Sequence, residues 1–461
     1  GRRMLTDPAL TDLRARFGDR MSASPASLAE HAQSESLVTA GLPDAVVFPR
    51  QTDEVAALAR WSTTHRVPLI GWGAGTSLEG HALAVSGGVV VDFRDMAAVL
   101  EVRAEDRLVR VQPGITREAL NHALRTTGLM FPVDPGANAS LGGMAATRAS
   151  GTTAVRYGTM RDNVRGLEVV LADGRVIRTG TGAPKSSAGY DLTALFVGSE
   201  GTLGLITGLT LRLHGQPEAV MTAVAAFPSV GAAVDCVMAV MQMGLTPARI
   251  EFLDADTVAA CNAYSHLSLP PAPQLLVEFH GHTAALDEDV SRFRTLATEH
   301  GAKGLDWAEK QEDRTRLWAA RHAAYRAILA SRPGAKAVVT DVCVPISALA
   351  AAVEETRADI AASGLSGPIL GHVGDGNFHA ILLVDPTDAG DISTAKALAH
   401  RMAERSLRLG GTITGEHGVG LGKRGMMATE HGAAWAVMGA LKRALDPLKL
   451  MNPGKLVPDQ P

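Results

Sequence analysis

Glycine is concentrated in one part of this chain, and that concentration most limits what the chain can fold into. The sequence holds 48 glycines in 461 residues, about a tenth, against a usual share of ~7%. They cluster between Gly71 and Gly208. Glycine is needed where the backbone passes close to a ligand or takes a positive φ. The clustering therefore indicates a large cofactor held mainly by main-chain atoms.

The bulk composition is that of a globular protein of two or three domains. Hydrophobic residues make up 46% and charged residues 20%, and the net charge of −4 is spread along the chain. No basic face for nucleic acid is therefore expected. Three widely spaced cysteines argue against a disulfide framework and favour a reducing compartment. We expect a cytoplasmic protein, with a peripheral membrane position as one alternative and a mitochondrial position, should an upstream targeting segment have been removed, as another.

The first half of the chain predicts a helical segment followed by an α+β domain. Residues 1–41 are expected to form one or two helices with a break at Ser24 and Pro25. A hairpin is expected over 167–180, because Asp173-Gly174 is a favoured turn dipeptide. Residues 42–217 read as one domain in which short strands (45–49, 67–73, 87–93, 107–114, 204–218) alternate with helices (54–65, 117–128).

The pattern changes near Pro217 to a second kind of domain over 218–410. Its expected strands cover 223–229, 274–282, 336–345 and 368–386, and its expected helices include 230–244 and 346–364. This order predicts an antiparallel sheet with helices on one side. The glycine-rich segment 411–461 is expected to complete the active site and to pack on the first domain. The predicted class is α+β, with a two-subdomain cofactor domain and a helix-covered substrate domain.

Three glycine-rich segments carry the cofactor argument. Residues 68–80 place glycines directly after a strand, where bare N–H groups can cradle a phosphate. A Rossmann fingerprint does not fit, because Thr76 occupies the place of its third glycine. Residues 132–164 form a long polar segment that would be a poor structural element unless it lined a ligand. Residues 197–207 are a third segment rich in glycine.

These segments resemble the FAD-binding domain of the vanillyl-alcohol-oxidase-type flavoproteins, and 185–204 is similar to that family's most recognisable run. The resemblance implies FAD along the three segments. Thr76 holds the place where some members carry a tethering histidine, which implies a non-covalent flavin. The implied FAD-binding residues are Gly71, Gly73, Ala74, Gly75, Thr76 and Ser77 at the pyrophosphate, Pro135, Gly136, Ala137, Ser140, Gly142, Gly143, Thr147, Ser150 and Gly151 along the ribityl chain and isoalloxazine, and Glu200, Gly201 and Ile206 by the adenine half.

A second group of residues predicts a metal site. A two-residue turn at Asp375-Gly376 would place His372 opposite His379, with Cβ atoms ~4.5–5.5 Å apart. Two imidazoles at that distance suit one divalent metal. The motif at 414–420 offers Glu416 and His417 between glycines, and a His₂Glu set with an open position is a catalytic metal arrangement.

Residues 219–457 resemble the C-terminal domain of the FAD-linked D-lactate, glycolate and D-2-hydroxyglutarate dehydrogenases. The resemblance implies Zn²⁺ or Mn²⁺ on His372, His379 and Glu416. It also implies His417 as catalytic base and Arg321 as the arginine that binds the substrate carboxylate. Lys336 and Asn377 are further candidates for facing the substrate. The run at 340–347 is more similar to the D-lactate branch than to the glycolate branch.

The implied reaction is oxidation of a D-2-hydroxy acid, with D-lactate to pyruvate as the leading candidate. The metal would lower the pKa of the hydroxyl, His417 would take its proton, and a hydride would pass to flavin N5. Electrons would leave to an external cytochrome, quinone or electron-transferring flavoprotein, and no transmembrane helix is expected. A homodimer is one expected form of the protein. The alternatives are glycolate or D-2-hydroxyglutarate as substrate, a zinc-dependent hydrolase, and a non-catalytic flavin-binding subunit.

Overall fold

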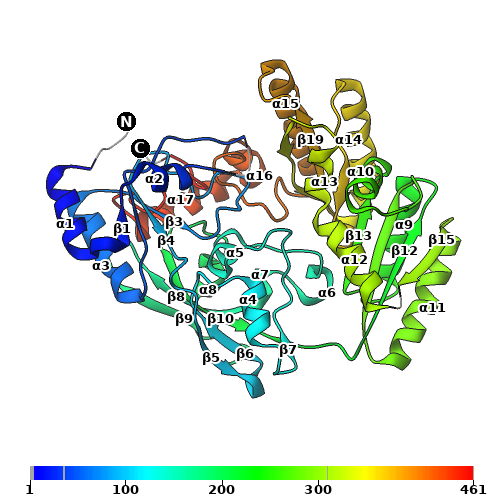
Figure 1. The fold of residues 1–461 in the computed structure, drawn as a ribbon, viewed down its shortest axis with the longest axis horizontal. Helices are drawn as coiled ribbons and strands as arrows, with labels where there is room; N and C mark the ends of the chain where they lie inside the picture. Colours follow the sequence, from blue (N-terminus) through cyan, green and yellow to red (C-terminus); the bar gives the residue numbers. More distant parts are fainter. Residues whose placement is uncertain (1–4, 35–36, 309, 460–461) are drawn as a thin grey trace. The chain divides into compact units, whose positions relative to one another are not determined.

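The computed structural model describes residues 5–34, 37–308 and 310–459. The chain divides into two compact units. Unit 1 comprises 1–150, 159–216 and 416–461, and unit 2 comprises 151–158 and 217–415. Unit 2 is drawn mainly in green to orange in Figure 1, and unit 1 in blue, cyan and red. Within the described residues, no helix has the length and apolar character needed to cross a membrane.

The first sheet of unit 1 is small and mostly parallel. Its strand order is β1-β2-β4-β3, with β2 and β3 parallel to β4. The side chain of Ser24 caps the second helix, which confirms the expected break at Ser24 and Pro25. The elements of this part are β1 (Met21–Ser22), β2 (Ala45–Val47), β3 (Leu69–Trp72), β4 (Val89–Asp92), α1 (Asp7–Phe17), α2 (Pro25–Glu30) and α3 (Thr52–His65).

The second sheet of unit 1 is antiparallel and has the order β5-β6-β10-β8-β9. Each sheet has its own hydrophobic core, so the expected two subdomains are present. The hairpin over 167–180 is confirmed, with Gly174 at a φ of 91°. The strands are β5 (Val99–Arg103), β6 (Leu108–Val111), β8 (Val164–Val170), β9 (Val176–Gly180) and β10 (Leu205–Arg212). Strand β5 was not predicted, because its side chains are largely exposed and show no apolar alternation.

Short elements complete unit 1. They are α4 (Arg117–Ala123), β7 (Leu129–Met130), α5 (Leu141–Thr147), α7 (Met160–Asn163), α8 (Leu192–Phe196), β11 (His214–Gly215), α16 (Met427–His431) and α17 (Ala433–Leu445). The C-terminal segment extends the first sheet. Leu69 donates its N–H to the carbonyl of Leu450, and Asn452 donates to the carbonyl of Leu69.

One antiparallel sheet forms the centre of unit 2. Its order is β15-β12-β14-β13-β18-β19-β16, and β17 pairs with β19. The strands are β12 (Ala219–Ala226), β13 (Arg249–Leu253), β14 (Gln274–Gly281), β15 (Lys303–Ala308), β16 (Lys336–Val339), β17 (Val342–Cys343), β18 (Ile369–Gly371) and β19 (Asn377–Val384). The antiparallel sheet predicted for this domain is confirmed.

Helices cover both faces of this sheet, so the expectation of helices on one side was wrong. On one face, Leu253 and Leu276 share a core with residues of α10, α12 and α13. On the other face, the ring of Phe279 lies 6.0 Å from that of Phe293 in α11. The strands are apolar on both faces, which fits burial on both sides. The helices of unit 2 are α6 (Ala154–Tyr157), α9 (Val230–Gln242), α10 (Ala255–Ser265), α11 (Thr283–Glu299), α12 (Gln311–His322), α13 (Ala324–Ala330), α14 (Leu349–Ser363) and α15 (Ala389–Arg408).

The turn between β18 and β19 is longer than the sequence predicted. A 3₁₀ turn over Val373–Asp375 is followed by Gly376 at a φ of 76°. Consequently Leu370, and not His372, lies opposite His379. The predicted register was wrong because a four-residue connection replaces the two-residue turn. His372 and His379 are instead diagonal neighbours, which long side chains can still bridge.

The packing of β14 on α11 gives a test of the fold. Replacing the fully buried Phe279 with alanine should lower the free energy of unfolding by about 3–5 kcal/mol, because it leaves a cavity beside Phe293. Chemical denaturation measures the change. Val176→Ala, at a 44% exposed position, is the control and should change it by less than about 0.5 kcal/mol. Equal effects of the two substitutions would contradict this packing.

Candidate functional site

A pocket in unit 1 is lined by the first glycine-rich segment. Its volume is about 480 Å³, which lies in the range of ~300–1,000 Å³ usual for small-molecule sites. Four residues that were expected to bind FAD line it together: Gly73, Ala74, Gly75 and Ser140. The structure thus brings the first and second glycine-rich segments to one cavity.

The glycines of this pocket are required by close packing. A Cβ atom on Gly75 would lie 2.7 Å from the ring of Trp72, and the φ of Gly75 is 71°. A Cβ atom on Gly73 would collide with the hydroxyl oxygen of Ser140. Bare main chain therefore faces the cavity, and main-chain N–H groups in such loops bind phosphate oxygens. The residues present fit the diphosphate of a dinucleotide.

Arg94, which also lines this pocket, is already paired with two carboxylates. The guanidinium of Arg94 lies 2.7 Å from a carboxylate oxygen of Asp92 and 2.7 Å from one of Glu30. Burial alone would raise the pKa of Asp92, but hydrogen bonds from His31 and Arg94 hold that pKa below its ordinary value. An anionic ligand in this pocket would therefore depend on the main chain more than on Arg94.

The second segment continues from the pocket into α5. Ser140 caps this helix by accepting a hydrogen bond from the N–H of Gly143 at 3.2 Å. A Cβ atom on Gly142 would lie 2.5 Å from Pro113, so α5 packs directly against Pro113. Ser150 is the last residue of this part of unit 1, and Gly151 is the first residue of the short segment that belongs to unit 2.

The third segment contacts the loop that carries His417. The carboxylate of Glu200 accepts the N–H groups of Val419 at 2.8 Å and Gly420 at 3.2 Å. It also lies 2.5 Å from Nε2 of the buried His81. Glu200 has a φ of 56°, an uncommon value for a residue with a side chain. The carboxylate of Glu200 therefore holds a loop of unit 1 in place, whereas Gly201 packs near Asn452 and Ile206 joins the core.

A buried lysine supports the same region of unit 1. Lys455 donates to the carbonyl of His81 at 2.9 Å and to the side-chain oxygen of Asn452 at 2.5 Å. Burial lowers the pKa of Lys455 to about 7, against partial compensation by Glu200. The cause is the loss of water around the amine, which disfavours its charged form.

His372 and His379 lie together in unit 2, which confirms their predicted proximity. Their ring centroids are 5.7 Å apart with an interplanar angle of 86°. A nitrogen of one ring lies within 4.8 Å of a nitrogen of the other. The two residues are only 7% and 6% exposed. Two nitrogen donors of this separation could bind one metal ion.

A buried carboxylate connects His372 to Arg321. Nδ1 of His372 lies 2.7 Å from Oε2 of Glu251, and the guanidinium of Arg321 lies 2.7 Å from Oε1. Glu251 is fully buried in β13, and Arg321 in α12 is 9% exposed. Arg321 thus lies beside the histidine pair, as expected for a residue of the same site. A metal ion would bind His372 through Nε2.

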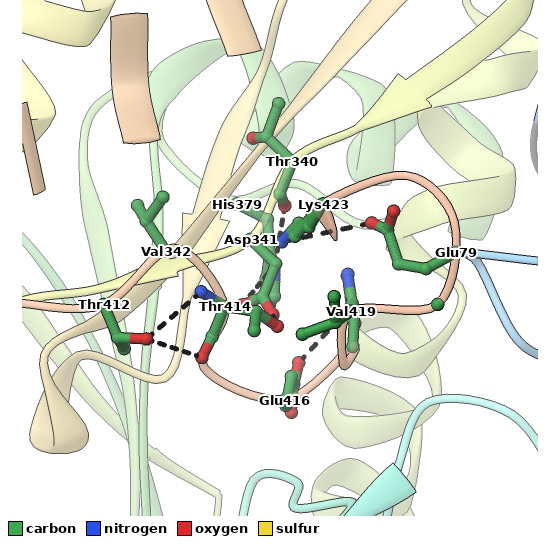
Figure 2. A network of polar contacts seen from close by, with 12 residues as sticks. Glu79, Thr340, Asp341, Val342, His379, Thr412, Thr414, Glu416, Val419 and Lys423 are labelled. Atoms are coloured by element: carbon green, nitrogen blue, oxygen red, sulfur yellow. Dashed lines mark hydrogen bonds and ion pairs between the residues drawn. The ribbon is translucent and has the colours of Figure 1, made fainter. Parts of the chain in front are cut away.

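A second buried carboxylate, Asp341, organises the neighbouring segment. It accepts the hydroxyl of Thr414 at 2.8 Å (Figure 2) and the amide of Asn377 at 2.8 Å. Nδ1 of His379 lies 3.0 Å from the carbonyl of Thr340 and 3.6 Å from Asp341. The amide of Asn377, a candidate for facing the substrate, is thus bonded to Asp341 and also to the carbonyl of Val342.

Glu416 and His417 lie in a loop of unit 1. The hydroxyl of Ser150 donates to Glu416 at 2.9 Å, and His417 Nε2 lies 3.8 Å from the Glu416 carboxylate. Both residues are partly buried. Nearby in this unit, Lys423 lies 4.0 Å from Glu79 (Figure 2). The acid and the imidazole are therefore held side by side in one short loop.

The structure does not bring Lys336 to this group. Lys336 is exposed, and strand alternation directs it to the face of the sheet opposite to His379. Two further histidines of unit 2, His280 and His282, each have their own acidic partner. His280 lies 2.7 Å from Glu278, whereas the exposed His282 lies 2.5 Å from Glu218.

Sequence reasoning missed Glu251 and Asp341. Each is a lone acid inside an apolar strand segment, in ARIEFL and in AVVTDVCV. A charged residue within a buried strand is rarely tolerated unless it is paired. That signal could have pointed to both residues, but it could not have named their partners, which are 70 and 121 positions away for Glu251.

Family models match both parts of the chain. The model described as "FAD binding domain" matches residues 43–180, and the one described as "FAD linked oxidases, C-terminal domain" matches residues 216–456. The second match covers more than half of the chain. The protein therefore belongs to the FAD-linked oxidase family.

Individual proteins are also similar to this chain in sequence or in fold. The chain is 50% identical over 453 residues to "Probable D-lactate dehydrogenase, mitochondrial" of Danio rerio, covering 97% of this chain and 91% of that protein. It is 44% identical over 418 residues to "D-lactate dehydrogenase (cytochrome), mitochondrial" of Arabidopsis thaliana, covering 90% and 74%. A solved alkyldihydroxyacetonephosphate synthase has the same fold, with a TM-score of 0.79 and 21% identity over 99% of this chain and 87% of that chain.

The glycine pocket leads to a test of cofactor binding. Gly75→Val should strongly reduce the flavin that is retained on purification, because the new side chain would meet Trp72 and strain a positive φ. The ratio of absorbance at the flavin band to that at 280 nm measures this content. Gly215→Val, where a side chain meets nothing within 4 Å, should retain flavin. Full flavin content in Gly75→Val would contradict the assignment of this pocket.

Proposed function

We propose that the protein oxidises D-lactate to pyruvate with FAD as oxidant and passes the electrons to an external acceptor. One observation carries this proposal: two buried imidazoles lie beside a buried arginine on one face of the sheet in a chain of the FAD-linked oxidase family. The two relatives described above bear the name of this activity. A zinc hydrolase would leave the FAD-binding domain without a role.

A divalent metal, Zn²⁺ or Mn²⁺, would be held by His372, His379 and Glu416. The two histidines are geometrically suited to it, and each has an acceptor at Nδ1 that fixes the ring, as metal-binding histidines usually do. Glu416 is two residues beyond Thr414, whose hydroxyl is bonded to Asp341. Within unit 1, the hydroxyl of Ser150 donates to the carboxylate of Glu416 at 2.9 Å. The donor set is that of a catalytic zinc-type site.

Arg321 would bind the substrate carboxylate. One terminal nitrogen of its guanidinium is used by Glu251, and its buried Nε has no hydrogen-bond acceptor among the residues that the structure describes. A buried donor in this position is stabilised when a carboxylate reaches it. His417 would accept the hydroxyl proton, since the pKa of an imidazole lies near working pH.

The bound cofactors would supply the remaining chemistry: FAD accepts two electrons as a hydride, and a divalent ion stabilises negative charge on the substrate hydroxyl. The protein orients the substrate through Arg321 and receives the proton at His417. FAD would be held without a covalent bond, since Thr76 is not a nucleophile suited to the flavin. Denaturation in acid should then release all of the yellow colour into the supernatant.

The names of the same relatives support a proposal for the acceptor and the location. A cytochrome is the favoured acceptor, with a quinone or an electron-transferring flavoprotein as alternatives, and by analogy with these relatives the proposed location is the mitochondrion. Glycolate and D-2-hydroxyglutarate are the alternative substrates. They differ from D-lactate only beyond Cα, so the carboxylate and hydroxyl contacts would be common to all three.

The substrate assignment is tested by anaerobic reduction of the bound flavin. D-lactate should bleach the flavin band faster than glycolate or D-2-hydroxyglutarate, and L-lactate should bleach it least. Stopped-flow absorbance gives the rate constants for the panel. A faster reduction by another D-2-hydroxy acid would move the assignment to that acid, and no reduction by any of them would favour a non-catalytic flavin-binding subunit.

The metal and base are tested together. Dialysis against a chelator should remove the metal and slow flavin reduction by D-lactate by more than 100-fold, and Zn²⁺ or Mn²⁺ should restore it, because the ion assists proton loss. His417→Ala should slow reduction by about 10²–10⁴-fold with flavin and metal retained. Metal analysis and stopped-flow absorbance measure both effects. Unchanged rates after chelation and in His417→Ala would overturn this mechanism.

A further inference from the structure

Glu251 lies at the centre of a polar group on a face of the unit 2 sheet that also carries an apolar core. The same face carries Leu253 and Leu276, which pack against α10, α12 and α13. Glu251 has no exposed surface. A carboxylate in such a place is costly unless it is paired and hydrogen-bonded, so its partners determine why it is there.

Each oxygen of this carboxylate has a defined partner. The guanidinium of Arg321 lies 2.7 Å from Oε1, while Nδ1 of His372 lies 2.7 Å from Oε2 and 2.9 Å from Oε1. Arg321 comes from α12, and His372 is the residue between β18 and the 3₁₀ turn that follows it. One side chain of β13 thus fixes two residues from two other elements.

We propose that Glu251 is a positioning residue that sets the spacing between the substrate-carboxylate group of Arg321 and the metal-binding imidazole of His372. This inference rests on the proposed function. Accepting the Nδ1 proton of His372 orients Nε2 outward, and pairing with one terminal nitrogen of Arg321 leaves the other donors of that guanidinium for substrate.

The spacing has a consequence for specificity. A 2-hydroxy acid carries its carboxylate and its hydroxyl on adjacent carbon atoms, whereas a 3-hydroxy acid separates them by one more. Two binding groups fixed by one rigid carboxylate accept the first arrangement and reject the second. Glu251 would therefore influence which class of hydroxy acid is oxidised, although it does not contact the substrate.

The test uses the FAD-bound protein with Glu251→Gln and Glu251→Asp. Glutamine is neutral, so it loses the ion pair with Arg321, and its NH₂ group replaces one of the two acceptor oxygens that now face Arg321 and His372. Glu251→Gln should weaken Zn²⁺ or Mn²⁺ binding by about 10–100-fold and raise the KM for D-lactate by about tenfold or more. Glu251→Asp keeps the charge and should recover part of both losses, and it remains informative if Glu251→Gln fails to fold.

Glu278→Gln is the matched control. Glu278 is a second buried glutamate on the same sheet face, with Thr222, Trp318 and His280 as its partners. Replacing this carboxylate should lower the stability of the protein without changing the metal affinity or the KM for D-lactate. Substrate selectivity is a further measurement. The ratio of the flavin reduction rate with D-lactate to that with D-3-hydroxybutyrate should fall in Glu251→Gln, and it should stay constant in Glu278→Gln.

The outcomes separate this inference from the function on which it rests. Wild-type metal affinity and KM in Glu251→Gln, or equal shifts in Glu278→Gln, would overturn the positioning role while leaving the D-lactate activity in place. If the wild-type flavin is not reduced by any 2-hydroxy acid, the proposed function fails and the role of Glu251 fails with it.

Discussion

The charge of one buried carboxylate is the constraint around which the candidate substrate site is arranged. Glu251 is fully enclosed in the sheet of unit 2, so it must have a cation and a hydrogen-bond donor within reach. Arg321 and His372 meet that need. Their positions are thereby fixed by electrostatics as well as by packing, and the helices and strands that carry them must keep a constant spacing. The apolar contacts of α10, α12 and α13 on the same face hold that spacing.

Asp341 has a parallel effect on the next segment. Its bonds to Thr414 and Asn377 tie the strand segment before β17 to the chain that leads into Glu416. Each histidine of the pair thus has an acidic neighbour: Glu251 lies beside His372, and Asp341 lies beside His379. In unit 1 the carboxylate of Glu200 has the equivalent effect on the loop after His417. Buried acids, each with specific donors, hold most of the chemically active side chains of this protein.

Much of this arrangement could be predicted from the sequence where local chemistry decides. The turn at Asp173-Gly174, the helix at 52–65 and the glycine-dependent pocket all follow from short-range patterns. The β18–β19 register could not be obtained this way, because Asp375-Gly376 suits a two-residue turn as well as the longer 3₁₀ turn that forms. Helices on both sheet faces were missed because buried strands carry no alternation to show which side is covered. The partners of Glu251 depend on contacts across long sequence separations, which no local pattern encodes.

The pairing of Leu69 with the segment at Leu450 has a consequence for the newly made chain. Strand β3 leaves the ribosome long before its C-terminal neighbour exists, and at ~5–20 residues per second the intervening residues take roughly 20–80 s to synthesise. During that interval one side of β3 is an unpaired strand edge, which other chains could join. All of unit 2 must also emerge before unit 1 can close. A chaperone that covers this edge would therefore have its greatest effect during that interval, before the last segment returns to β3.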